Sequence, residues 1–178
     1  MKWYYGFLLV YFCLNQSLVG GTMKLTSADF KHSEQIPTRF TCEGENISPN
    51  LFWTGAPSKM ETFVVIVEDP DAPSAKNPNK DAWVHWVAFN IPHTVHRLDV
   101  GAAIHALGGK EGINDSKNKK YDGPCPPAGS GPHRYFFRLY ALNVTLSLHA
   151  GATKQEVVDA MKHHIIAQGE LIGTYEIK

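Results

Sequence analysis

The feature that most constrains the fold is a pair of prolines that ends an apolar run. Residues 62–67 are Thr-Phe-Val-Val-Ile-Val, a β-branched and aromatic run that predicts a buried strand. Pro70 and Pro73 follow closely, and because each lacks an N–H group and fixes φ, the chain must leave the sheet there. Asp69 and Asp71 are therefore held in a stiff turn. Aspartate is a common turn residue, but two carboxylates at a strand exit also predict a functional site.

Two further stretches strengthen the functional interpretation. Residues 83–92 form another strand-like run, in which His85 lies among aromatic and β-branched neighbours. Residues 121–132 are rich in Gly and Pro and lead to His133, just before a third strand-like run at 135–142. Glycine lets a ligand approach the main chain, and proline reduces the entropy lost when a loop is ordered. A lone histidine in a strand is usually a core residue, but this loop predicts that His133 belongs to a site.

In this order, the motifs resemble those of the phosphatidylethanolamine-binding protein family. They are Asp-Pro-Asp-Ala-Pro at 69–73, Trp-Val-His at 83–85, and a Gly-Pro-Cys-Pro-Pro loop at 123–127 that ends in Gly-Pro-His-Arg-Tyr. Residues 40–49 and 112–115 add to the likeness, which is closer to the bacterial, Raf-kinase-inhibitor-like branch. The resemblance implies a mainly β fold, an antiparallel Greek-key β-sandwich with a few peripheral helices, including one near the C-terminus.

The resemblance also implies an anion-binding pocket without a metal. Its residues would be Asp69, Asp71, His85, Gly123, Pro124, His133 and Tyr135. Because two carboxylates repel an anion, we expect Asp69 or Asp71 to accept a hydrogen bond from one of the two histidines, raising its pKa and aiming its other ring nitrogen into the pocket. Backbone N–H groups of residues 123–130 would add donors. The second carboxylate would suit an amine, so the pocket fits a zwitterion such as an ethanolamine headgroup.

Alternation along the third strand divides the residues around His133. Tyr135 shares the face of His133 and can donate from its phenol, whereas Arg134 points the other way and is expected to form a structural ion pair. Tyr121, Trp83 and Trp86 are further candidates for the pocket rim.

The leading functional hypothesis is a non-catalytic module that binds phosphorylated or other anionic small molecules, such as phospholipid headgroups. In the wider family, such modules also restrain kinases or proteases. Two alternatives stay open: a metal-dependent hydrolase with two Asp and two His around a zinc or manganese ion, and a protein-interaction module that uses the pocket as a switch. A serine hydrolase is disfavoured, because Ser130 lies in Gly-Ser-Gly rather than Gly-x-Ser-x-Gly.

The remaining elements are predicted from local pattern. Short strands are expected at residues 30–34, 39–42 and 51–53, and a last strand at 172–177. One helix is expected at residues 154–168, with Thr153 and Glu156 as a capping box, a Val157, Met161 and Ile165 face, and Gly169 at its end.

The N-terminus and the cysteines bear on location. Residues 1–21 have the pattern of a secretory signal peptide, which leaves a single domain at 22–178; the protein is then periplasmic or secreted, or cytoplasmic if translation starts at Met23. Cys42 and Cys125 are a candidate disulfide after export and free thiols otherwise. The 17 Lys plus Arg residues equal the 17 Asp plus Glu residues, so no net positive charge favours binding to nucleic acid. No transmembrane anchor is expected.

Overall fold

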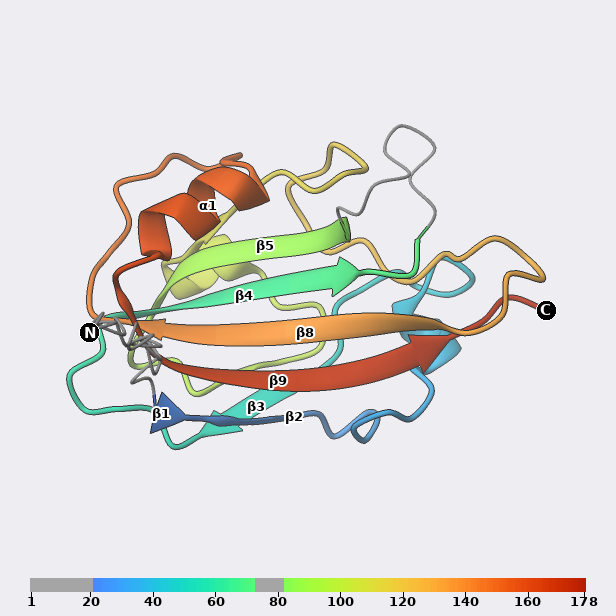
Figure 1. Cartoon of the computed structure of the whole chain (residues 1–178), viewed down its shortest axis with the longest axis horizontal. Helices are drawn as coiled ribbons and strands as arrows, with labels where there is room; N and C mark the ends of the chain where they lie inside the picture. The colour runs from blue at the N-terminus through green and yellow to red at the C-terminus, as the bar shows by residue number, and fades with distance from the viewer. Residues whose placement is uncertain (1–20, 73–81) are drawn as a thin grey trace, which may run out of the picture.

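Two β-sheets dominate the computed structural model, which describes residues 21–72 and 82–178 (Figure 1). The six-stranded sheet has the order β1-β9-β8-β4-β5-β7, and the three-stranded sheet has the order β2-β3-β6. The strands are β1 (Gly21–Thr22), β2 (Lys24–Thr26), β3 (Leu51–Thr54), β4 (Thr62–Asp69), β5 (Trp83–Pro92), β6 (Arg97–Leu98), β7 (Lys110–Glu111), β8 (His133–Leu142) and β9 (Ile165–Tyr175). The helices are the 3₁₀ turns η1 (Thr38–Phe40) and η2 (Ile104–Leu107) and the α-helix α1 (Lys154–Met161). Paired strands are antiparallel except β1 and β9. The predicted fold class, mainly β with a helix near the C-terminus, is confirmed.

Strand β4 is buried at all eight positions because both faces of the large sheet are covered. One face packs in a first core that includes Val65 and, from the small sheet, Trp53. The other face packs in a second core that includes Val64 and, from α1, Val157 and Met161. Figure 1 shows α1 lying beside β5, with β2 and β3 on the far side of the large sheet. Because both faces of β4 are buried, the strand contains an unbroken apolar run instead of alternating apolar and polar residues.

The helix predicted at residues 154–168 is longer than the helix that forms. Its capping box forms as expected between Thr153 and Glu156, but α1 ends at Met161, and β9 begins at Ile165. Strand β9 pairs along nearly the whole of β8, a long-range gain that outweighs the local helical pattern. Gly169 therefore lies inside a strand, where a Cβ would come within 2.6 Å of the Met23 carbonyl oxygen. The glycine is needed for this close approach, not for a helix end.

Two short predicted strands are also wrong. Residues 30–34 form turns, with only an adjacent bridge between Gln35 and Thr174, and residues 39–42 begin in the 3₁₀ turn η1. The strands at 51–53, 62–68, 84–91 and 135–142 are confirmed, each within two residues at either end. Apart from Gly21, which pairs with Ala167, the predicted signal peptide lies outside the described residues, as does Pro73. In the described ranges, no helix is long and apolar enough to cross a bilayer.

Candidate functional site

A cavity of about 230 Å³ opens where β4 ends and where β5 and β8 begin. The residues lining it are Asp69, Ala72, Trp83, His85, Ser116, Asp122, Gly123, Cys125, Pro126, Pro127, His133 and Tyr135. Five of the seven predicted site residues are among them, and Asp71 and Pro124 are not. Strands far apart in sequence thus deliver the predicted side chains to one place.

The pair of Asp69 and His133 forms the buried floor of this site. Oδ2 of Asp69 lies 2.8 Å from Nδ1 of His133, and both side chains are almost fully buried. Oδ1 of Asp69 accepts the backbone N–H of Asp71 at 2.8 Å. The predicted contact between an aspartate and a histidine is therefore present. Because it engages Nδ1, Nε2 is the ring nitrogen that remains for another partner. That remaining atom, Nε2, lies 3.1 Å from Oγ of Ser130.

Asp71 has a different role from the one predicted. Its two carboxylate oxygens bind the guanidinium of Arg134 at 2.8 Å each, and Oδ2 also accepts the Arg134 backbone N–H. These hydrogen bonds hold the pKa of the Asp71 carboxyl below its usual value. The predicted structural ion pair of Arg134 is confirmed, but it occupies Asp71 and turns that carboxylate away from the cavity. Asp71 is thus no partner for a ligand amine.

His85 reaches the cavity because β5 carries a β-bulge. Trp86 pairs with Val67 and Val84 pairs with Glu68, so His85 between them is an extra residue with no partner on β4. Val84 packs in the second core and Trp86 in the first, so the bulge lets a third side chain emerge at the sheet end. A β-bulge commonly redirects a side chain in this way near a functional site.

The hydrogen bonds of the His85 ring assign its tautomer. Nδ1 lies 2.7 Å from the carbonyl oxygen of Asp122, which can only accept, so Nδ1 carries the proton. Nε2 is buried and has no hydrogen-bond partner among the residues described. Burial lowers the pKa of His85, and the Asp122 carbonyl and nearby carboxylates only partly oppose this. His85 is bound to the Asp122 carbonyl and not to Asp69 or Asp71, so it is not the histidine for which a raised pKa was predicted.

Tyr135 supplies a second unsatisfied polar atom. Its ring meets the His85 ring edge to face, with centroids 5.2 Å apart. Its hydroxyl is buried and, within the ranges that the structure describes, has no partner. Burial, with the carboxylate of Asp69 adding to it, raises the pKa of Tyr135, so the phenol keeps its proton and can donate. A buried unpaired hydroxyl costs free energy, which makes it a natural point for a ligand to bind.

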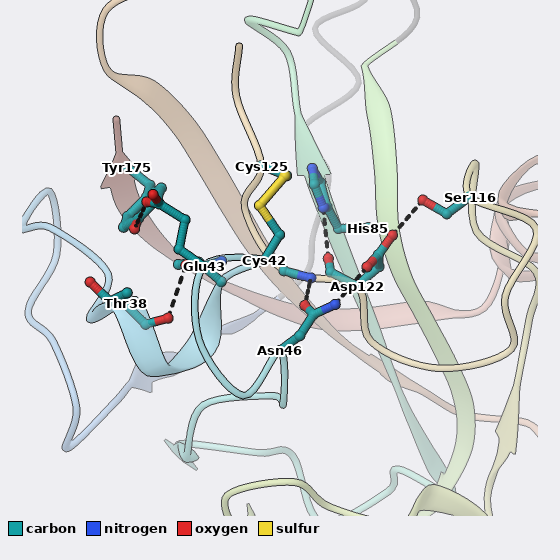
Figure 2. Close-up of a disulfide and its surroundings, with 11 residues drawn as sticks. Thr38, Cys42, Glu43, Asn46, His85, Ser116, Asp122, Cys125 and Tyr175 are labelled. Carbon is teal, nitrogen blue, oxygen red and sulfur yellow. Dashed lines mark hydrogen bonds between the residues drawn. A yellow bond between two sulfur atoms is a disulfide. The ribbon is translucent and has the colours of Figure 1, made fainter. Parts of the chain in front are cut away.

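The opposite wall is a loop, held in place by a second loop through Asn46 (Figure 2). The Asn46 amide donates to Oδ1 of Asp122 at 3.0 Å, and its oxygen accepts the Gly123 N–H at 2.6 Å. Ser116 donates to the other carboxylate oxygen of Asp122. A Cβ on Gly123 would lie 2.2 Å from the Phe40 carbonyl oxygen. This glycine is therefore needed for the close contact between the two loops.

A disulfide joins the same two loops. Cys42 and Cys125, 83 residues apart in sequence, are bonded, and the Cys42 N–H donates to the Pro124 carbonyl at 3.1 Å. Figure 2 shows the bridge beside the His85 ring. Pro124 thus anchors the loop from behind, while Cys125 lines the cavity. The question that the sequence left open, disulfide or free thiols, is answered in favour of the disulfide.

The expected nest of free N–H groups at residues 123–130 does not form. Gly123 donates to Asn46, Gly129 to the Ile177 carbonyl, and Ser130 to the Pro127 carbonyl. Three more of these residues are prolines, which have no N–H group. Only the amides of Cys125 and Ala128 have no bond to another described residue. Ligand contacts must therefore come mainly from side chains.

The metal-dependent alternative needs Asp69, Asp71, His85 and His133 to converge on one point. Asp71 is instead engaged by Arg134, and His85 holds the Asp122 carbonyl with one nitrogen. Across the described ranges, no group of three or more His, Cys, Asp or Glu side chains is placed to hold a metal ion.

Comparison with known proteins identifies the family. The model of the phosphatidylethanolamine-binding protein family matches residues 26–176. The chain belongs to this family. The UPF0098 protein of Methanothermobacter thermautotrophicus is 46% identical over 156 residues, which cover 86% of this chain and 98% of that protein.

Two solved structures carry the same family fold. A phosphatidylethanolamine-binding protein homologue from Chlamydia trachomatis has a TM-score of 0.81 at 40% identity, with 89% of this chain and 100% of that chain covered. YbcL of E. coli, described as a new member of the mammalian family, has a TM-score of 0.80 at 34% identity and the same coverage. The resemblance found in the sequence motifs is therefore confirmed.

Several cavity residues of this family member were missed by sequence reasoning. Asp122 lines the cavity, where Asp71 was predicted, and Ser116 and Cys125 line it as well. Trp83 stands at the cavity as expected, whereas Trp86 and Tyr121 are buried and pack edge to face against each other. The one available signal for Asp122 was its position immediately before Gly123 in the Gly/Pro loop.

Proposed function

We propose that the protein is a non-catalytic binding module for phosphate-containing or other anionic small molecules, held in the cavity by Asp69, His85, His133 and Tyr135. The observation that carries the proposal is that Nε2 of His85 and Oη of Tyr135 are both buried and, in the described part of the chain, both unpartnered. Both residues line the same cavity. Two unpaired polar atoms at one cavity cost stability unless a bound molecule or water completes their hydrogen bonds.

The charges around the cavity favour a zwitterionic molecule of the phosphoethanolamine kind. Tyr135 offers a hydroxyl donor to a phosphate oxygen, and the carboxylate of Asp69 is hydrogen-bonded to His133. Asp122 lies at the other wall, and because its hydrogen-bond donors Asn46 and Ser116 are neutral, its negative charge is left to attract an ammonium group. The family membership supports this ligand class.

The test is thermal unfolding of the full chain with inorganic phosphate, phosphoethanolamine or zinc added separately, because a ligand of the native state raises its stability. We expect phosphoethanolamine to raise the Tm, and Tyr135→Phe to reduce that rise with the fold retained. Arg134→Gln is the matched control, since Arg134 faces away from the cavity, and its response should equal that of the wild type. Stabilisation by zinc with no effect of either phosphate compound would reject the proposal in favour of a metal site.

The proposal includes a protein partner, such as a protein kinase, whose binding the small molecule would control. Trp83 supports it, because this large aromatic side chain is 38% exposed beside the cavity, and exposed aromatic residues are common at protein interfaces. The measurement is the affinity of a purified Raf-type kinase domain with and without phosphoethanolamine. Equal affinity in both states contradicts control by the ligand.

We also propose that the protein works in an oxidising compartment, the periplasm or the cell exterior. The disulfide between Cys42 and Cys125 supports this, since such bonds persist mainly outside the cytosol. Fractionation of the source cells, followed by thiol labelling, tests it. A cytosolic pool with two free thiols would contradict the proposal.

One observation favours a second candidate, an esterase-like hydrolase. Oγ of Ser130, Nε2 and Nδ1 of His133 and Oδ2 of Asp69 form a hydrogen-bonded chain of 3.1 and 2.8 Å, the order found in serine hydrolases. Ser130 would attack an ester carbonyl while His133 takes its proton, the alcohol would leave with that proton, and water would then release the acid. This candidate ranks second because Ser130 does not line the cavity.

Hydrolysis of p-nitrophenyl acetate separates the two candidates. A serine hydrolase loses its activity in Ser130→Ala and keeps it in Ser116→Ala, the matched control. Activity that is equal in the wild type and in Ser130→Ala removes the second candidate.

A further inference from the structure

The His85 ring differs from the usual anion-binding histidine in what it offers to the cavity. Its Nδ1 proton is committed to the Asp122 carbonyl at 2.7 Å. In a neutral imidazole, the other nitrogen is then an acceptor, so Nε2 presents a lone pair and not an N–H group. The Asp122 N–H donates back to the His85 carbonyl at 3.1 Å, so two hydrogen bonds fix the ring and the loop against each other. The ring therefore cannot easily turn over to present a donor.

The groups around the ring determine whether it stays neutral. Asp69 faces it from the end of β4, Asp115 and Asp122 from the loops, and His133 and Tyr135 from β8. The carboxylates favour a charged ring, but burial outweighs them and lowers the pKa of His85. The carboxylate of Asp69 is already bound by His133, and one oxygen of Asp122 is bound by Asn46 and the other by Ser116. Near neutral pH, the cavity thus holds a hydrogen-bond acceptor at Nε2 and a donor at the Tyr135 hydroxyl.

We propose that the cavity selects tetrahedral oxyanions that carry a proton, namely phosphomonoesters, against phosphodiesters and sulfate. The inference rests on the proposed function and specifies its ligand. A P–O–H group of the ligand donates to Nε2 of His85, while an unprotonated oxygen accepts from the Tyr135 hydroxyl. Phosphomonoesters have a second pKa of about 6 and can supply this proton, whereas phosphodiesters and sulfate have no proton to give near neutral pH. An intact phospholipid is a phosphodiester, so this selection favours free phosphomonoesters over membrane lipid.

Proton linkage follows from the same geometry. Above pH 6, a phosphomonoester is mostly the dianion, so its binding takes up one proton, whether the proton ends on the phosphate or on Nε2. Affinity for a phosphomonoester should fall about tenfold per pH unit above the ligand pKa of about 6. A phosphodiester or sulfate needs a protonated His85, and its affinity should rise only as the pH falls through the lowered pKa of that ring.

Calorimetry on the full-length wild type tests the inference with two ligands that share an amine. Phosphoethanolamine is a monoester and glycerophosphoethanolamine is a diester, and both carry the same ammonium group. At pH 7.5 we expect the monoester to bind at least about tenfold more tightly. Titrations with phosphoethanolamine in buffers of different ionisation enthalpy should show that the complex takes up about one proton on binding.

The outcomes separate the inference from the proposed function. Equal affinities, or no proton uptake, would overturn the inference and leave a phosphate-binding module, with the shared ammonium as the donor to Nε2. Binding of neither ligand would overturn both. Tyr135→Phe should weaken both ligands by a similar factor and keep the selectivity, whereas His85→Gln should reduce the selectivity, because an amide offers a donor as well as an acceptor.

Discussion

Two ion pairs, Asp69–His133 and Asp71–Arg134, join the same two segments of the chain. The two aspartates are two residues apart, and His133 and Arg134 are adjacent. The side chains of Asp69 and His133 are 3% and 5% exposed, whereas those of Asp71 and Arg134 are 29% and 54% exposed. Alternation along β8 sends His133 to the inner face and Arg134 to the outer one. Neighbouring carboxylates of one turn therefore have different functions: the inner pair builds the cavity, and the outer pair fastens the turn to β8.

The largest expected effect comes from breaking the inner pair. His133→Ala leaves the buried carboxylate of Asp69 without its ring partner and should lower the free energy of unfolding by about 3 kcal/mol. Urea denaturation at pH 7 measures it. If the cost is an unpaired buried charge, Asp69→Ala combined with His133→Ala should cost less than the sum of the single changes. Strict additivity would contradict this coupling.

Removal of the disulfide should have the next largest effect, again on the inner side. Replacing Cys42 and Cys125 by Ser frees a long loop in the unfolded chain and should cost about 2–3 kcal/mol. Because Cys125 lines the cavity, we expect ligand affinity to fall as well, which calorimetry with phosphoethanolamine measures. Unchanged affinity would show that the Asn46 hydrogen bonds alone hold the loop wall.

Breaking the outer pair should have a small effect. Arg134→Gln removes an exposed ion pair and should lower the free energy of unfolding by less than about 1 kcal/mol, with ligand affinity unchanged. The difference from the wild type should shrink in 1 M NaCl, since salt screens exposed charges. A cost as large as that of His133→Ala would remove the distinction between the two pairs.

The smallest effect is the pH dependence of the outer pair. Hydrogen bonds from Arg134 hold the pKa of Asp71 below its usual value of 3.8. A carboxyl with a lower pKa in the folded state stabilises the fold above its unfolded pKa and loses that contribution as the pH falls through the folded pKa. The stability difference between wild type and Arg134→Gln should thus be constant above about pH 5 and decline below about pH 4. Urea titrations at each pH measure it, and a difference that grows in acid would contradict the assignment.

Local pattern was enough to predict much of the fold and part of the site. The runs that become β4, β5 and β8 carry their own β-branched and aromatic signal, and the two prolines after Asp69 mark where β4 must stop. The faces of His133, Arg134 and Tyr135 followed from alternation. Each of these features depends on residues close in sequence, which is why the sequence alone suffices for them.

The remaining features depend on partners distant in sequence. The C-terminal helix pattern competes with pairing to β8, and only the assembled sheet decides that Ile165 begins a strand. The contact of Asn46 with Gly123, the choice of Arg134 as the partner of Asp71, and the disulfide all join segments more than 60 residues apart. No periodicity encodes such contacts, so the roles of Asp71, Gly123 and Pro124 could not be derived in advance.

The β-bulge at His85 has a consequence for how this site can be lost in evolution. The orientation of the ring depends on one extra residue between the partners of Val67 and Glu68. Deleting Val84 would keep every side chain of the cavity and restore regular pairing, but His85 would then take the place of Val84 and face the second core. A lineage could therefore lose the binding site by a one-residue deletion while all of its site residues stay unchanged.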